Sequence, residues 1–434
     1  MSQHGLWREF QVISLLASRL RKLLKGPIAR ATFNSSLMLG LRLVVQAGTL
    51  IVLARALGPA QFGAYMALGA LAVLLGALAS FGTHLTMLRD ITRTPSLRDE
   101  SLRLALGTTT LCGSGLLCLY GLLCTFWLHP VDAGITVIAC LGVSELVFQP
   151  FLLIAAMERY GRGQVIRHQL LLVFPLALRM SIALTVRWLA PAYPLAVFAA
   201  GHLMAVVVAL AVAVVMAPVS WPAPWRWRWP RAAEWRDAAS YAFLNVSTSG
   251  VAELDKMLAG KLLAPSVAGL YSAASRVIGA LVLPVIAMVL AAIPRLFRES
   301  GPNGRRLHRW LFASALSYGV LAGLAIWLLC PLIQLIFGPR YAAMNEVIRW
   351  LAWGVPPISL RATAVNVLLT VDRPWLRTGL ELSGWCVMAV VAWALAPTLG
   401  ATGVALAVVC SEWLLAGMSW GAVWHSSRRF IPRT

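Results

Sequence analysis

Twelve long apolar runs constrain this chain more than any other feature of its sequence. A helix that crosses a bilayer core of about 30 Å needs about 20 apolar residues. Transmembrane β-strands are about 10 residues long and alternate in polarity, which these runs do not. The runs lie near residues 31–54, 62–88, 102–126, 131–157, 165–189, 192–217, 238–260, 267–294, 308–330, 343–370, 377–396 and 401–424. The sequence therefore predicts an all-α polytopic membrane protein with twelve transmembrane helices.

The composition excludes an ordinary soluble protein. Of the 434 residues, 59% are hydrophobic and 12% are charged, whereas soluble domains have roughly 45–50% and about 25%. The net charge of +21 would suggest nucleic acid as the partner of a soluble protein. In a membrane protein, basic cytoplasmic loops explain such a charge. We therefore expect the lipid bilayer, and no nucleic acid, as the surroundings of this chain.

The distribution of basic residues predicts the orientation of the spans. With twelve spans, 27 of the 37 Lys and Arg residues fall on the side that the N-terminus shares. The opposite side carries four, which are Arg55, Arg187, Lys261 and Arg340. Because basic loops stay cytoplasmic, we expect both termini to face the cytoplasm. The predicted location is the cytoplasmic (inner) membrane of a bacterium.

A repeat relates the two halves of the chain by a shift of 206 residues. The segment 56–67 aligns with 262–273, so that Pro59 matches Pro265 and Gly63 matches Gly269. Halves that are six spans apart share one orientation, so their pseudo-two-fold axis runs along the membrane normal. We expect two six-helix bundles with a central cavity between them. The predicted structural hairpin motif comprises Arg55, Gly58, Pro59, Gly63, Tyr65, Lys261, Pro265, Gly269 and Tyr271.

The predicted organisation has five parts. Residues 1–30 form a basic amphipathic segment that lies on the membrane surface, with a plain basic tail as the alternative. The two bundles comprise residues 31–217 and 238–425. Between them, residues 218–237 form a linker with alternating Trp and Arg, which favours anchoring at the membrane interface over nucleic-acid binding. Residues 426–434 form a basic cytoplasmic tail.

Charged residues inside predicted spans are expensive, so each is a candidate for function. Two i,i+3 pairs, Glu253–Lys256 and Glu346–Arg349, are expected to neutralise themselves on one helix face. Arg349 and Glu381 lie near span ends, where they can reach the interface. The remaining groups form two sets. An arginine fork suits a phosphate, which makes Arg42, Arg179, Arg276 and Arg361 candidates to line the cavity. A buried carboxylate suits ion or proton coupling, which makes Glu145, Asp255 and Glu412 the coupling candidates.

The sequence carries no motif typical of an enzyme. It contains no G-x-x-x-x-G-K loop for ATP and no H-E-x-x-H metal motif. The predicted outward loops are too short to form a folded domain. We therefore predict no catalytic residue, no metal site and no cofactor.

The chain resembles the Wzx-type polysaccharide flippases, which belong to the same superfamily as the multidrug and toxin extrusion (MATE) transporters. The first hairpin carries the resemblance as Arg55-Ala-Leu-Gly-Pro-Ala-Gln-Phe-Gly-Ala-Tyr65. In the second half, Asp255, Gly269-Leu-Tyr271, Phe337-Gly-Pro-Arg-Tyr341 and Leu399-Gly-Ala-Thr-Gly-Val-Ala405 are similar to the family. The likeness extends over nearly the whole chain and implies a MATE-like fold.

The resemblance also implies the cargo, which is an undecaprenyl-pyrophosphate carrying an oligosaccharide repeat. Such a flippase moves this lipid from the cytoplasmic to the outer leaflet for cell-surface or exopolysaccharide synthesis, next to a polymerase and export machinery. Two other functions remain open: a cation-coupled multidrug exporter, and an integral-membrane enzyme of glycan assembly.

Overall fold

The computed structural model describes residues 27–129, 133–217, 219–298, 301–368 and 374–429. The predicted N-terminal amphipathic segment lies almost entirely outside these ranges, as does most of the predicted basic tail. Within them every regular element is a helix, and none is a strand. The α-helices are α2 (Pro27–Ala79), α3 (Thr83–Arg93), α4 (Arg98–Leu123), α5 (Ile135–Val143), α6 (Gln149–Gly161), α7 (Val165–Leu189), α8 (Pro194–Val215), α9 (Ala232–Leu262), α10 (Pro265–Leu281), α11 (Leu283–Arg298), α12 (Gly301–Phe337), α13 (Met344–Ala352), α14 (Val355–Leu368), α15 (Pro374–Leu399) and α16 (Ala401–Arg429). The 3-10 and π-helical turns are η1 (Pro95–Leu97), η2 (Cys124–Leu128), η3 (Ser144–Phe148), η4 (Pro224–Arg226) and η5 (Pro339–Tyr341).

Nine helical segments among the described residues are long and apolar enough to cross a membrane. The first of them contains two predicted spans, because α2 is kinked at Gly58, where φ is +73°, directly before Pro59. Two further predicted spans fall on α9, which is more polar, and on α13 and α14, which are individually short. The described helices are therefore consistent with the predicted twelve spans, and the prediction of an all-α polytopic membrane protein is confirmed.

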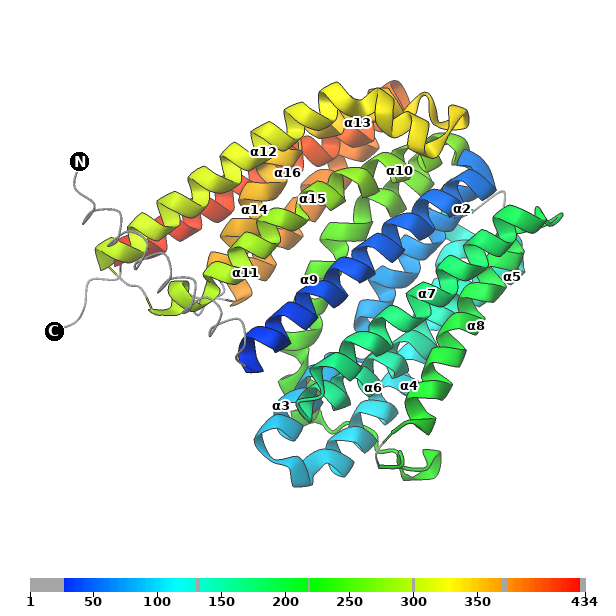
Figure 1. Ribbon diagram of the computed structural model, residues 1–434, viewed down its shortest axis with the longest axis vertical. Coiled ribbons are helices and arrows are strands. Elements are labelled where there is room, and N and C mark those ends of the chain that lie inside the picture. The colour runs from blue at the N-terminus through cyan, green and yellow to red at the C-terminus, as the bar shows by residue number, and fades with distance from the viewer. Residues whose placement is uncertain (1–26, 130–132, 218, 299–300, 369–373, 430–434) are drawn as a thin grey trace, which may run out of the picture.

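The helices of the two halves lie on opposite sides of the molecule (Figure 1). Helices α4 to α8 form one group, and α11 to α16 form the other, with α2, α9 and α10 between them. Helix α2 packs against α7 of its own half and against α9 and α10 of the second half. The exact boundaries of the two bundles and of the linker stay predictions.

The two repeated hairpins pack against each other at one end of the molecule, which we call the hairpin end. A Cβ atom added to Gly63 would lie 2.1 Å from the carbonyl oxygen of Pro265. A Cβ atom added to Gly269 would lie 1.9 Å from the carbonyl oxygen of Pro59. Both positions therefore require glycine, because α2 and α10 cross there with their backbones in contact.

Basic side chains add reciprocal contacts at the hairpin end. Nη2 of Arg55 donates a hydrogen bond to the carbonyl of Leu335 in α12, at 2.8 Å. The repeat partner of Arg55, Lys261, donates to the carbonyl of Trp127 in η2 and lies over its indole ring. Each half thus sends one basic side chain to the backbone of the other half.

The opposite end, which we call the linker end, carries the Trp/Arg-rich linker. The backbone N–H of Arg228 donates to the carbonyl of Arg103 at 3.1 Å, and the Trp221 indole donates to Glu158 at 3.2 Å. Trp225 and Trp229 are exposed there, and their anchoring at the membrane interface stays a prediction. At the same end, Arg89 of α3 forms a 2.8 Å ion pair with Asp237 of α9.

Candidate functional site

Glu145 is the centre of a charged group in the first half. Its Oε1 accepts a hydrogen bond from Nη2 of Arg179 at 3.3 Å and lies 2.9 Å from Nε2 of His202. The hydroxyl of Tyr65 lies 3.5 Å from the other ring nitrogen of His202. The group therefore joins a cavity candidate, Arg179, to a coupling candidate, Glu145, and neutralises both.

Local backbone geometry places Glu145 at this point. It lies in η3, a π-helical turn between α5 and α6, and such turns are common at functional sites. Two glycines allow neighbouring helices to approach this turn. A Cβ atom on Gly76 of α2 would lie 2.8 Å from the Glu145 carbonyl oxygen, and one on Gly113 of α4 would lie 2.5 Å from that of Leu146. The turn is thus held from two sides.

A second ion pair, from the other half of the chain, lies near the first. Nη2 of Arg276 in α10 is 2.8 Å from Oε2 of Glu253 in α9. The Arg276 side chain is 30% exposed, while Glu253 is buried. Tyr65 lies within electrostatic range of both ion pairs. We call the six residues from the two halves the Tyr65 cluster: Tyr65, Glu145, Arg179, His202, Glu253 and Arg276.

Asp255 is buried within the second half, and both of its carboxylate oxygens have partners. It pairs with Nζ of Lys256 at 2.9 Å, and it accepts hydrogen bonds from Tyr271 at 3.0 Å and Ser275 at 2.5 Å. Tyr271 is the repeat partner of Tyr65. Both tyrosines thus place their hydroxyl groups against ionisable side chains of their own half.

A third charged group lies among α9, α14, α15 and α16. Nε of Arg361 is 2.5 Å from Oε2 of Glu412, so these two predicted candidates pair with each other. Next to them, Glu381 pairs with Arg377 at 3.5 Å and accepts a hydrogen bond from Ser247. Glu381 is 2% exposed. The expectation that it reaches the interface is therefore wrong, because its helix face packs into the bundle.

Neither of the two expected i,i+3 pairs occurs among the described contacts. Lys256 pairs with its neighbour Asp255, and Glu253 pairs with Arg276 of the next helix. Arg349 instead lies over the ring of Trp327, at 5.5 Å from its centroid. Spacing within one helix predicted these pairs, but Lys256 pairs with its chain neighbour on α9, and Glu253 pairs with a residue of α10.

Arg42 differs from the other predicted cavity cations. It is half-buried in α2, and it has no hydrogen-bond or ion-pair partner among the side chains that the structure describes. It lies sixteen residues before the kink at Gly58, about 24 Å from the hairpin end at 1.5 Å per residue. A guanidinium group without a carboxylate is available for an anionic ligand.

Five charged or ionisable participants were absent from the predicted site residues: His202, Glu253, Lys256, Arg377 and Glu381. Glu253 and Lys256 were set aside because of their spacing. His202 stands alone in a strongly apolar span, and a polar ring in such a span is a signal that sequence reasoning can use. Its partner Glu145 is 57 residues away, so the contact itself could not be predicted.

The fold of the described helices is similar to that of solved membrane transporters. The lipid II flippase MurJ in an inward closed conformation superposes with a TM-score of 0.70 at 12% identity, over 90% of this chain and 87% of that one. An inward-facing multidrug resistance MATE family transporter of the MOP superfamily gives 0.68 at 14% identity, over 90% and 96%. An outward-facing MATE family transporter gives 0.62 at 14% identity, over 94% and 98%.

The family model described as "Polysaccharide biosynthesis protein" matches residues 28–300. The chain therefore belongs to the polysaccharide biosynthesis protein family, and it has a MATE-like fold that the solved MATE transporters and MurJ share. No curated protein matches it. The family and fold expected from the first hairpin motif are thereby confirmed.

Proposed function

We propose that this protein is a flippase for an undecaprenyl-pyrophosphate-linked oligosaccharide. It moves the repeat unit from the cytoplasmic to the outer leaflet of a bacterial inner membrane, for cell-surface or exopolysaccharide synthesis. In this proposal the linker end and both termini face the cytoplasm, and the hairpin end faces outward. A polymerase or export machinery receives the product, and the protein itself catalyses no covalent step.

The observation that carries this proposal is the guanidinium of Arg42, which has no partner among the side chains that the structure describes. Its distance of about 24 Å from the hairpin end puts it toward the linker end of a bilayer core about 30 Å thick. The pyrophosphate of a prenyl lipid lies at that depth in the cytoplasmic leaflet. Arg42 therefore serves as the first cation that the pyrophosphate meets. Arg276, whose side chain is partly exposed, is the member of the Tyr65 cluster that the pyrophosphate meets next.

The packing of glycines supports alternating access. At the hairpin end, Gly63 and Gly269 are in backbone contact. Nearer the linker end, Gly40 of α2 and Gly279 of α10 have no described atom within 4 Å of an added Cβ. The contacts of Gly63 and Gly269 support a state closed at the hairpin end. The halves also meet at the linker end, where a Cβ atom added to Gly82 would lie 2.6 Å from the carbonyl oxygen of Ala238. Separating the hairpins would open the molecule on the outer side.

The multidrug-exporter alternative fits the charges less well. Binding of a cationic drug requires an available carboxylate in the cavity. Glu145, Asp255 and Glu412 are each neutralised by a basic side chain in this structure. An anionic ligand is the better match for the one predicted cavity cation that lacks a described partner.

The test is a gene deletion complemented with wild type, Arg42→Ala or Arg42→Lys. We expect the deletion to accumulate complete undecaprenyl-pyrophosphate repeats, measured by mass spectrometry, while surface polymer disappears. Arg42→Ala should restore less than about a tenth of the polymer, because a charge-assisted contact to phosphate is lost. Arg42→Lys should restore an intermediate level, since lysine keeps the charge and loses the fork.

Arg187→Ala is the matched control, because Arg187 is an exposed basic residue at the hairpin end. It should restore polymer fully. If the deletion strain failed to form complete repeats, or carried unpolymerised repeats on the outer leaflet, the flippase would be rejected in favour of an enzyme of glycan assembly.

A further inference from the structure

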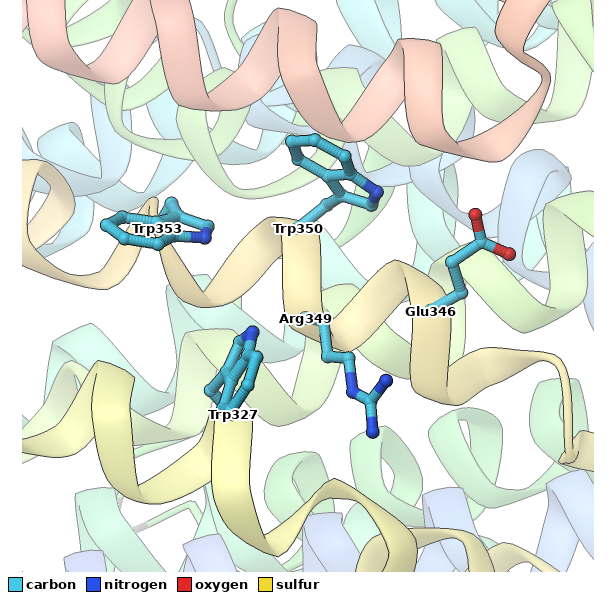
Figure 2. A pocket seen from close by; sticks show the side chains of 5 residues that line it. All are labelled: Trp327, Glu346, Arg349, Trp350 and Trp353. Carbon is cyan, nitrogen blue, oxygen red and sulfur yellow. The ribbon is translucent and has the colours of Figure 1, made fainter.

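A pocket of about 290 Å³ lies on the second half of the chain, between α12 and α13 (Figure 2). Its lining combines three indole rings with one acid and one base: Trp327, Glu346, Arg349, Trp350 and Trp353. None of these residues belongs to the Tyr65 cluster. The pocket is therefore a separate feature, which the proposed transport function does not use.

The pocket is charged at its mouth and aromatic below. Glu346 lies in the first turn of α13, which follows η5 at the hairpin end. Its carboxylate is 3.5 Å from the hydroxyl of Thr402, at the start of α16. Trp353 lies seven residues further along, about 10 Å deeper in the membrane. Charges at headgroup depth and indoles beneath them match the polarity gradient of a phospholipid.

Neither charged side chain at the mouth of the pocket forms an ion pair with another described residue. Glu346 and Arg349 are exposed, and no ion pair joins them among the described residues. The Arg349 guanidinium lies over Trp327, with 5.5 Å between its central carbon and the ring centroid. A cation–π contact of this kind holds the charge next to the indole. The site thus offers guanidinium N–H donors for an anion and a carboxylate for a cation.

We propose that this pocket binds the headgroup of a zwitterionic phospholipid of the phosphatidylethanolamine type. The phosphate accepts hydrogen bonds from Arg349, and the ammonium group pairs with Glu346. Residues at i and i+3 are about 5–6 Å apart on a helix, which suits a phosphate and an amine separated by two carbons. The upper parts of the acyl chains lie along Trp350 and Trp353, which are 40% and 64% exposed.

The charge pattern distinguishes this occupant from others. An anionic lipid would satisfy Arg349 and be repelled by Glu346. Aromatic residues that only anchor the protein at the membrane interface need neither charge. A second copy of this chain, if it bound here, would have to cover both charges with complementary groups. Binding that depends on both Glu346 and Arg349 is therefore specific to a zwitterion.

The test is native mass spectrometry of the full-length protein, purified in detergent and incubated with phosphatidylethanolamine or phosphatidylglycerol. We expect one phosphatidylethanolamine per chain to be retained about tenfold more tightly than phosphatidylglycerol. Glu346→Gln should abolish this preference. Arg349→Gln should weaken the binding of both lipids by about tenfold. Trp350→Ala together with Trp353→Ala should weaken both without changing the preference.

Two substitutions at the same end of the membrane serve as controls. Arg187→Gln and Trp188→Ala remove an exposed base and an 87% exposed indole from α7, and neither should affect retention. Thermal unfolding of every variant verifies that it is folded. Equal retention of the two lipids by the wild type would overturn the proposal. So would a lipid preference that survives Glu346→Gln, or a dimer that Trp353→Ala dissociates.

Discussion

Gly63 and Gly269, which the internal repeat relates, each lie against the backbone of the other's hairpin. An added Cβ would approach a carbonyl oxygen to 2.1 Å at Gly63 and to 1.9 Å at Gly269. These separations are far below any van der Waals contact, so α2 and α10 can cross this closely only with glycine at both positions. The repeat thus preserves glycine where its two copies meet on the pseudo-two-fold axis.

Replacing either glycine should force the hairpins apart. We expect Gly63→Ala and Gly269→Ala each to destabilise the protein by about 1–3 kcal/mol, the usual cost of overpacking. Thermal unfolding in detergent measures this loss. The double variant should cost less than the sum of the single variants, because the first methyl group already separates the helices.

The same helices provide matched controls for this experiment. Gly69 in α2 and Gly279 in α10 have no described atom within 4 Å of an added Cβ. Alanine there should be neutral or slightly stabilising, since it lowers the entropy of the unfolded chain. A loss at Gly69 equal to that at Gly63 would contradict the close crossing.

Arg55 and Lys261 should hold the hairpin end closed. Each donates a hydrogen bond to a carbonyl in the opposite half. Hydrogen bonds from charged donors contribute about 1.5–3 kcal/mol. Replacing both by alanine should therefore raise the open population at this end by tenfold or more. Distance measurements between spin labels at Phe126 and Leu335, which are both exposed, follow this change.

Arg187→Ala is the control for this pair, because it removes an exposed base at the same end. The distance distribution should not change. If the Arg55→Ala, Lys261→Ala variant kept the wild-type distribution, the two hydrogen bonds would have no role in closing the hairpin end.

Glu145 and Arg179 should be coupled in stability. Glu145→Gln leaves the half-buried Arg179 guanidinium without its carboxylate, and breaking a buried ion pair costs about 3–5 kcal/mol. The double variant Glu145→Gln, Arg179→Gln should recover much of this loss. A double-mutant cycle of unfolding free energies measures the coupling. Additive losses would contradict the pairing.

The same variants separate stability from transport. If the pair serves transport, the double variant should be stable and still restore little surface polymer. Full polymer synthesis by the double variant would instead assign the pair to the packing of α7 against η3.

The Arg89–Asp237 pair at the linker end should make stability depend weakly on pH. The hydrogen bonds from Arg89 hold the pKa of Asp237 below its ordinary value of 3.8. A lowered folded-state pKa contributes stability above the unfolded-state pKa, and this stability is lost as the pH falls through the folded-state pKa. Because the Asp237 side chain is 51% exposed, the contribution should stay below about 1 kcal/mol.

Comparison of the wild type with Asp237→Asn tests this dependence. The variant should unfold at a slightly lower temperature near neutral pH. The difference should shrink as the pH falls below the ordinary pKa of 3.8, and it should vanish below the lowered folded-state pKa of Asp237. Arg89→Gln should give the same profile. A difference that persists in acid would have to come from another group.

The sequence alone predicted the helical fold and the repeat. Span length and apolar composition are local properties, so the runs of residues could be read directly from the chain. The shift of 206 residues identified Gly63, Gly269, Arg55 and Lys261 as equivalent. The motifs around Tyr65 and in the second half indicated the family, which the match over residues 28–300 confirmed.

The pairing of the intramembrane charges could not be predicted in the same way. Arg179–Glu145 and Arg361–Glu412 were proposed as separate candidates for two roles, yet each pair forms one neutral unit. A single sequence gives the depth of a charge in the membrane but not the direction in which its helix face points. For the same reason Glu381 was expected at the interface and lies buried.

The sequence by itself determined that this chain spans a membrane, that its two halves are related, and which residues carry charge within it. These properties follow from the energetic cost of placing polar groups in lipid, and this cost applies to each segment independently of the others. Only the tertiary structure decided which charges neutralise one another, that Arg42 has no described partner, and that the two hairpins meet at glycine. These relationships depend on the rotation and crossing of whole helices, which are set by packing between segments far apart in the chain.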